Sequence, residues 1–465
     1  MRALLPASLA VLTVALAACP EERPPPLEPI KVGVLSPLSG ALAGLGPAWE
    51  DAVRLAAEEV NAGGGVFDGR PLQLIFRDSG TSAAVAVTGA QELLAEGVVG
   101  VVGPGTSGES GAVLADVAMP ASIPMVSCCA TAADLTANNP PNGGFFFRTT
   151  PSDRLQGKAL AYLAKNGFAA RSLEACPITA FIHRNDPYGE GFFSVFAESY
   201  VDQTISGTTE QGALVGTVGG APITYGSPEN EATQAELNSA ADLLVNSIGD
   251  ELVDDVAQPN LCVVVISFDT DGGPVVSRVH DGLQQLVEAR AAAGFSLTWN
   301  FLLGDGANSS AFAAEVGAEV PLLGTVPYHA DNDAYARFSK AYRARYQQDG
   351  EPIAFTSQSY DALFLMALAI TKARSTVGVD IRNALFAVSG ANDGDARFEG
   401  KFFGEVAAAI LDGQEVDYVG PSGEVTFDAF GDVVGDYVTW QVEADGAGGF
   451  RVVEREALKA ADFSD

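Results

Sequence analysis

Histidine and basic residues are scarce in this 465-residue chain, and each shortage narrows the range of functions. With only three histidines, there is little room for a metal site built from several imidazoles. The 26 basic residues face 59 acidic ones, which gives a formal net charge of −33. Nucleic acids and anionic lipid surfaces are bound through basic patches, so neither is expected as a partner. The acidity is best explained as a solvated surface.

Common catalytic motifs are also missing. The segment Thr106-Ser107-Gly108-Glu109 lacks the Gly-x-Ser-x-Gly frame of a nucleophile elbow, and residues 103–108 lack the lysine of a phosphate-binding loop. Neither 269–272 nor 392–395 completes a calcium-binding loop. We therefore expect no enzymatic activity, no cofactor and no bound metal.

The one long apolar run lies at the N-terminus. Residues 3–18 follow Met1-Arg2 and have the length of a secretory signal peptide, too short for a stable membrane-spanning helix. The run ends in Leu16-Ala17-Ala18-Cys19, which resembles the lipobox of bacterial lipoproteins; a plain signal peptide with an incidental cysteine is the alternative. We expect a signal peptide over 1–18 and a lipidated, proline-rich tether over 19–29. The protein would then be exported and anchored to the cell envelope by lipid alone.

Four further cysteines remain, and an exported location permits disulfides between them. Cys176 and Cys262 each lie close to a β-rich run, so a disulfide can join them if the two strands are parallel neighbours. Cys128 and Cys129 are adjacent in sequence. We expect them to be two small buried thiols rather than a strained vicinal bridge.

Strand and helix patterns alternate along the chain, which predicts doubly wound parallel sheets. The expected strands are 30–35, 72–76, 98–102, 124–126, 178–182, 263–266, 300–303 and 437–442. The expected helices are 47–61, 83–95, 153–166, 274–293, 333–347 and 356–373. Residues 205–260 are rich in glycine and acidic residues around one helical piece, 234–248, and suggest a loop insertion.

The pattern of the first half returns beyond Gly324, so the chain is expected to cross more than once between two α/β lobes. We assign 30–150 plus 326–420 to lobe 1 and 151–325 plus 421–455 to lobe 2. Such lobes, joined by a multi-strand hinge, would enclose a cleft.

Small hydroxyl residues follow two neighbouring strands of the first lobe. Thr106 and Ser107 come after the strand 98–102, and Ser127 and Thr131 come after the next one. Ligands bind at the carboxyl ends of strands in open α/β sheets, and free N–H groups at a helix start attract anions. One such loop would be explained by ordinary helix capping, whereas two at neighbouring strand ends favour a binding site.

A series of short motifs occurs in a fixed order along the chain. The motifs are Ser39-Gly40, Glu58-Glu-Val-Asn-Ala-Gly-Gly64, Gly103-Pro104, Ile123-Pro124, Ala130-Thr131, Phe147-Arg-Thr149, Asp186-Pro-Tyr-Gly189 and Tyr360-Asp-Ala362. The set resembles the type I periplasmic binding proteins, and best their leucine/isoleucine/valine-binding branch, which serves ABC importers. The resemblance covers about 30–453 and implies a two-lobe Venus-flytrap fold that closes over its ligand.

The resemblance also implies roles for polar residues. Ser107 would bind the ligand carboxylate, and Thr131 would bridge carboxylate and ammonium. Cys129 would offer its backbone carbonyl to the ammonium, with Ala130 beside it in the same loop. Asp305 would pair with the ammonium, although a turn residue flanked by glycines is the alternative reading.

Apolar contacts follow from the same resemblance. Tyr188 and Phe268 would form the wall of the second lobe, and Leu45 would touch the ligand side chain. Tyr188 could instead be a simple turn aromatic. Phe268 stands where several family members use tyrosine, and a cysteine at 129 is unusual beside the ligand, so both departures bear on ligand choice.

Together these features predict a monomeric receptor that delivers an aliphatic amino acid, branched-chain first, to ABC permease subunits. The alternative is a ligand-sensing receptor domain of the same fold that binds an amide or a small carboxylate.

Overall fold

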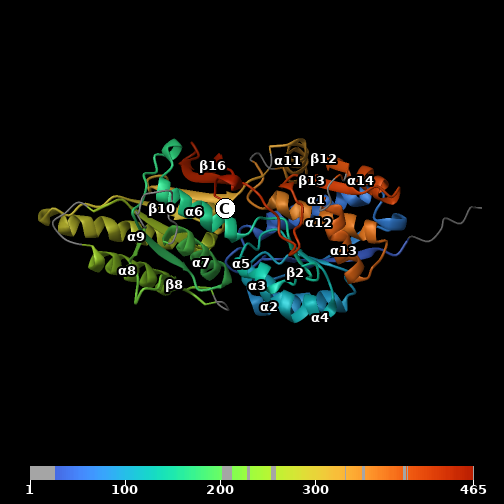
Figure 1. The fold of residues 1–465 in the computed structure, drawn as a ribbon, viewed down its shortest axis with the longest axis horizontal. Helices are drawn as coiled ribbons and strands as arrows, with labels where there is room; N and C mark the ends of the chain where they lie inside the picture. The colour runs from blue at the N-terminus through green and yellow to red at the C-terminus, as the bar shows by residue number, and fades with distance from the viewer. Residues whose placement is uncertain are drawn as a thin grey trace, which may run out of the picture.

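A computed structural model describes residues 27–201, 212–227, 231–252, 258–329, 331–347, 351–390, 394 and 396–463. The expected signal peptide, the lipidation site Cys19 and most of the tether therefore lie outside the described residues. The α/β class with two parallel-sheet lobes is confirmed. Figure 1 shows the lobes side by side, with α7, α8 and α9 on one and α1, α12, α13 and α14 on the other.

Lobe 1 is built on a five-stranded parallel sheet in the order β2-β1-β3-β4-β5. Its strands are β1 (Ile30–Ser36), β2 (Leu72–Asp78), β3 (Val101–Val102), β4 (Met125–Ser127) and β5 (Phe146–Arg148). Its helices are α1 (Gly46–Ala62), α2 (Ala83–Ala95), α3 (Ser107–Val113), α4 (Met119–Ala121), α5 (Ala133–Asn138), α11 (Asp333–Tyr346), α12 (Thr356–Ala373), α13 (Gly378–Val388) and α14 (Phe403–Leu411). A small second sheet joins β12 (Ala396–Glu399), β13 (Val416–Gly420) and β14 (Gly423–Glu424).

Lobe 2 has an eight-stranded sheet in the order β16-β15-β11-β10-β9-β6-β7, with β8 also paired to β6. Its strands are β6 (Ile178–Arg184), β7 (Ala213–Val215), β8 (Ile223–Tyr225), β9 (Leu261–Ile266), β10 (Trp299–Leu303), β11 (Leu322–Pro327), β15 (Tyr437–Ala444) and β16 (Phe450–Leu458). Its helices are α6 (Asp153–Asn166), α7 (Pro187–Val201), α8 (Gln234–Glu251), α9 (Asp269–Arg290) and α10 (Ser310–Val316).

The structure corrects several expected boundaries. The region 205–260 is more than a loop insertion, because β7 and β8 add to the sheet edge beside β6. The segment after 420 stays with lobe 1, since β14 pairs with β13 and Val433 packs in the lobe 1 core. Beyond residue 420, the chain returns to the sheet of lobe 2 at β15, which pairs antiparallel with β11 and β16.

Helix α12 forms the centre of lobe 1, and all its residues except Lys372 and Ala373 are buried. Within the described residues no single helix is long and apolar enough to cross a membrane. Among the described helices, α12 and α13 reach that length and composition only as a pair, and the two are bent by 111° relative to each other. Their burial inside lobe 1 explains their hydrophobicity.

Three chain segments cross between the lobes, and the third contacts each of the other two. The first follows β5, the second follows β11 and the third precedes β15. Pro151 in the first forms an isolated bridge with Val433 in the third, and Tyr328 N–H in the second donates to the Asp436 carbonyl at 2.9 Å. These crossings form the hinge.

Candidate functional site

A pocket lies between the two lobes at the carboxyl ends of their strands. It is lined by Leu42, Leu45, Trp49, Gly105, Thr106, Ser107, Cys129, Thr131, Tyr188, Phe268, Asp305, Gly306 and Phe355. Seven of the eight site residues expected from sequence are among them. The eighth, Ala130, is fully buried and does not line the pocket. The cavity between the two lobes is narrow in this arrangement, with a volume of about 20 Å³.

Helix α3 begins at the pocket with a capping box. The Glu109 N–H donates to Thr106 Oγ1 at 3.2 Å, and the Thr106 N–H donates to Glu109 Oε2 at 3.0 Å. The next residue, Ser107, accepts a hydrogen bond from the Ala132 N–H at 3.1 Å, so its hydroxyl is held against the second loop. Burial raises the pKa of Glu109 to about 7. The first turn thus places N–H groups and the hydroxyls of Thr106 and Ser107 beside the pocket.

The second loop, residues 127–132, is fixed by a buried serine. Ser127 Oγ donates to the Pro104 carbonyl at 2.6 Å and accepts from the N–H groups of Cys129 at 3.3 Å and Ala130 at 3.1 Å. One hydroxyl therefore ties the two hydroxyl-bearing loops together. This is a role for Ser127 that the sequence did not suggest.

Cys128 and Cys129 form a vicinal disulfide, with their Cα atoms 3.7 Å apart. Two separate thiols were expected, so the structure corrects that interpretation. The loop between β4 and α5 brings the two side chains together, a conformation that adjacency in sequence does not specify. A second disulfide joins Cys176 and Cys262, whose Cα atoms are 5.5 Å apart, where the parallel strands β6 and β9 begin.

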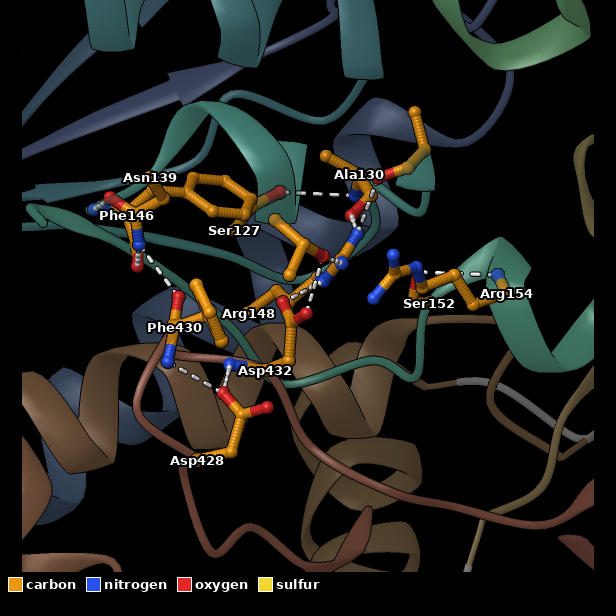
Figure 2. A network of polar contacts seen from close by, with 12 residues as sticks. Ser127, Ala130, Asn139, Phe146, Arg148, Ser152, Arg154, Asp428, Phe430 and Asp432 are labelled. Carbon is orange, nitrogen blue, oxygen red and sulfur yellow. Dashed lines mark hydrogen bonds and ion pairs between the residues drawn. The ribbon is translucent and has the colours of Figure 1, made fainter. Parts of the chain in front are cut away.

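Arg148 holds the second loop from behind, as Figure 2 shows. Its Nη1 donates to the carbonyls of Ala130 at 3.2 Å and Ala132 at 3.0 Å, and its Nη2 donates to Thr136 Oγ1 at 2.8 Å. Its Nε pairs with Asp432 Oδ1 at 2.6 Å, and Asp432 lies on the third hinge segment. The fully buried guanidinium therefore connects the pocket loop directly to the hinge.

Lobe 2 contributes one carboxylate and two stacked aromatic rings. Tyr188 Oη donates to Asp305 Oδ1 at 2.7 Å. The other oxygen, Asp305 Oδ2, is buried and has no hydrogen-bond partner among the described residues. The Tyr188 and Phe268 rings stack with centroids 5.7 Å apart, and the Arg184 guanidinium lies over the far face of Phe268 at 4.1 Å. Arg184 is held by Asp186, at 2.9 Å, and by Asp271.

Sequence reasoning missed a second buried carboxylate beside the pocket. Asp153 starts α6, its N–H donates to the Thr131 carbonyl at 2.8 Å, and neither of its carboxylate oxygens has a partner in the described part of the chain. Burial, and then the nearby Asp305, raise the pKa of Asp153; burial likewise raises the pKa of Asp305. An acidic residue in the first turn after Ser152 is ordinary helix chemistry, so the sequence carried no signal for a binding role.

Two further aromatic residues, Trp49 and Phe355, also border the pocket. Trp49 packs edge-on against Phe355 with ring centroids 5.9 Å apart, and its Nε1 donates to the Ala354 carbonyl at 2.9 Å. Across the cleft, Thr270 Oγ1 of lobe 2 donates to the Ala41 carbonyl of lobe 1 at 3.3 Å. The lobes are thus in direct contact at the pocket rim.

The site has the features of a binding pocket. Hydroxyl and N–H donors lie on lobe 1, unpaired carboxylate oxygens lie opposite, and apolar rings form the walls. Groups of three or more histidine, cysteine or acidic side chains able to hold a metal ion are absent from the residues that the structure describes.

Comparison with known proteins agrees with this architecture. The sequence profile of the family described as "Periplasmic binding protein" matches residues 29–250, and that described as "Receptor family ligand binding region" matches 247–445. The chain has the type I fold of the solved periplasmic binding protein structures, with two parallel-sheet lobes.

Individual relatives extend over nearly the whole chain. The chemotactic signal transduction system substrate-binding protein BasB of Halobacterium salinarum is 26% identical over 94% of this chain and 92% of its own length. The Leu/Ile/Val-binding protein BraC3 of Rhizobium johnstonii is 26% identical over 92% of this chain and 95% of its own. The crystal structure of the branched-chain amino acid transporter substrate binding protein LivJ from Streptococcus pneumoniae, in complex with isoleucine, has a TM-score of 0.62 at 22% identity and covers 92% of this chain and 100% of that protein.

Proposed function

We propose that this protein is the extracytoplasmic solute receptor of an ABC importer and that it binds a branched-chain or other aliphatic amino acid between its lobes. The observation that carries the proposal is the pairing of opposite chemistries in one pocket. Ser107 and Thr131 offer donors on one side, and Asp305 offers an unpartnered carboxylate oxygen on the other. The relative BraC3, whose name gives leucine, isoleucine and valine as ligands, supports the same class.

A zwitterion needs a fixed partner for each charge when it leaves water. The α-carboxylate would accept from Ser107 Oγ, from Thr131 Oγ1 and from free N–H groups at the start of α3. The ammonium would donate to Asp305 Oδ2, to the Cys129 carbonyl and to Thr131 Oγ1. Asp153, buried beside Asp305, would add negative potential at the same end. The two carboxylates hold protons more tightly than usual until such a cation arrives.

The ligand side chain would meet an apolar surface. Leu42, Leu45 and Trp49 come from lobe 1, and the stacked rings of Tyr188 and Phe268 come from lobe 2. Phe268 offers no hydroxyl to a ligand. The guanidinium of Arg184, on the ring of Phe268, forms ion pairs with Asp186 and Asp271. This wall favours an aliphatic side chain over a charged one.

Ligand binding would stabilise the closed arrangement, because the two halves of the pocket belong to different lobes. Entry requires separation of the lobes about the three hinge segments, and Arg148 would carry that motion to the second loop. The closed protein would then dock on permease subunits as a monomer. The proposed lipid anchor at Cys19 would keep the receptor at the membrane. Mass spectrometry of the mature protein, purified from the organism that produces it, tests whether Cys19 is the N-terminal residue and carries lipid.

Thermal unfolding in the presence of single amino acids tests the proposal. A ligand at one hundred times its dissociation constant adds about 2.7 kcal/mol to the stability of the folded state. We expect leucine, isoleucine or valine to raise the melting temperature while aspartate and lysine do not. A rise with simple carboxylates or amides only would refute the ammonium assignment.

A second candidate is a receptor for chemotaxis rather than import, because BasB carries that role in its name. The same pocket would serve both functions. Disruption of the gene distinguishes them: loss of labelled amino acid uptake supports the importer, whereas unchanged uptake with loss of a swimming response supports the sensor.

A further inference from the structure

The wall of the pocket contains a disulfide in place of ordinary side chains. Cys129 lines the pocket, and the pair Cys128–Cys129 is buried in an apolar cluster with Leu45, Tyr188 and Phe268. The cluster contains residues of both lobes, so the disulfide lies where the two lobes meet.

The disulfide constrains the backbone that faces the ligand. A bond between adjacent cysteines closes a ring of eight atoms that includes the peptide bond between them. On the far side of Cys129, the Ala130 carbonyl accepts from Arg148 and the Thr131 carbonyl accepts from the Asp153 N–H. The Cys129 carbonyl therefore lies between two fixed points, and the ring is one of them.

Opening the bond would alter the pocket as well as the loop. Two thiol sulfurs cannot remain at the bonding distance of about 2 Å, so at least one must move away. Cys128 and Cys129 are only 5% and 8% exposed, which leaves little room except toward the pocket. The loop would also regain backbone freedom, and binding would have to order it again.

We propose that the Cys128–Cys129 disulfide is a built part of the ligand site and that its redox state controls binding. The oxidised protein binds its amino acid tightly, and the reduced protein binds it weakly. Reduction takes two electrons and two protons from a dithiol reductant, breaks the sulfur–sulfur bond and leaves two thiols. This inference rests on the proposed function, because it concerns the affinity for the amino acid of that pocket.

Linkage makes the effect reciprocal. If reduction weakens ligand binding tenfold, saturating ligand must make the disulfide tenfold harder to reduce. For a two-electron couple this is about 30 mV in reduction potential. A disulfide with a purely local structural role would show no such ligand dependence.

The test measures L-leucine binding by calorimetry with purified protein before and after treatment with a water-soluble phosphine. The phosphine is oxidised to its oxide, with oxygen taken from water, as the disulfide becomes two thiols. Alkylation and peptide mass mapping identify which bond has opened. The double variant Cys128→Ala/Cys129→Ala keeps the other disulfide, and the matched control Cys176→Ala/Cys262→Ala keeps only the vicinal one. Thermal unfolding without ligand shows that each variant is folded.

We expect reduction to raise the dissociation constant for leucine at least tenfold in the native protein and in the Cys176→Ala/Cys262→Ala variant. The Cys128→Ala/Cys129→Ala variant should bind leucine at least tenfold more weakly than the native protein, and the phosphine should not change its affinity. If that variant folds and binds within threefold of the native protein, or if the reduced native protein binds as before, the inference is overturned. Should the matched control not fold, the native protein with mass mapping gives the same answer. No response to leucine in any oxidised form would overturn the proposed function and this inference with it.

Discussion

Replacement of Asp305 by asparagine separates ligand binding from stability. Asp305 Oδ2 is buried and has no hydrogen-bond partner in the described structure, while Oδ1 accepts from Tyr188. Asparagine keeps the shape and an acceptor for Tyr188 but removes the charge. The binding proposal therefore predicts a large loss of affinity from a change that leaves the neighbouring packing intact.

The size of the loss follows from the burial of the charge. Breaking a buried ion pair by removing one partner costs about 3–5 kcal/mol. Asp153 and the Cys129 carbonyl would still face the ammonium in Asp305→Asn, so we take the lower end, about 3 kcal/mol. That is a loss in affinity of roughly a hundredfold. Calorimetric titration with L-leucine at pH 8, where the native carboxylate is ionised, measures it.

The same substitution should stabilise the protein without ligand. Burial raises the pKa of Asp305, which means that its ionised form is costly in the folded state. At pH 8 the unliganded variant should therefore melt above the native protein, although it binds less. Asp281→Asn, on the exposed surface of α9, is the matched control and should change neither property. An Asp305→Asn protein that binds leucine with native affinity would refute the ammonium assignment.

Three further predictions concern stability and the hinge. Burial raises the pKa of Glu109 from 4.5 to about 7, so between these pH values the folded protein keeps a proton that the unfolded chain releases. The free energy of unfolding should therefore fall by about 3 kcal/mol as the pH rises from 4.5 to 7 and beyond. Denaturant unfolding at several pH values should show this slope in the native protein and not in Glu109→Gln. Arg148→Lys keeps the positive charge but loses the branched guanidinium that reaches two carbonyls and Asp432. We expect urea unfolding to show a free energy of unfolding lower by about 2–4 kcal/mol, and leucine to bind more weakly. Unchanged leucine affinity would contradict the link between the second loop and the hinge. Cys176→Ala/Cys262→Ala removes a disulfide that joins residues 86 positions apart, so the free energy of unfolding should fall by about 3–5 kcal/mol. Leucine affinity should be retained, because neither residue lines the pocket. A loss of affinity in the folded variant would contradict this expectation.

Local patterns determined most of the secondary structure. The helices α2, α6 and α12 have the bounds expected from the sequence pattern. These signals are strong because a helix is stabilised by contacts between residues close in sequence. Errors occurred where the neighbour is distant: β7, β8 and β16 form only because another strand offers them hydrogen bonds. The strand expected over 98–102 is shorter in the structure, where β3 covers Val101–Val102.

The sequence by itself determined the class of fold and the presence of two hydroxyl-bearing loops at neighbouring strand ends. These features depend on local periodicity, on turn residues such as Gly103-Pro104-Gly105, and on the order of motifs. The resemblance to a family then placed seven residues that the structure finds around one pocket. Local chemistry thus specified which loops carry the site.

Only the tertiary structure decided how those residues meet. Tyr188 and Asp305 pair across 117 positions, Arg148 reaches Asp432 across 284, and Asp153 lies buried beside the pocket with no signal in its own segment. The vicinal disulfide depends likewise on how the loop folds between β4 and α5. Such contacts follow from the order of strands in two sheets and from lobe closure, and the energy of a buried charge depends on everything packed around it. A local sequence pattern specifies neither the arrangement of strands and lobes nor the energy of a buried charge.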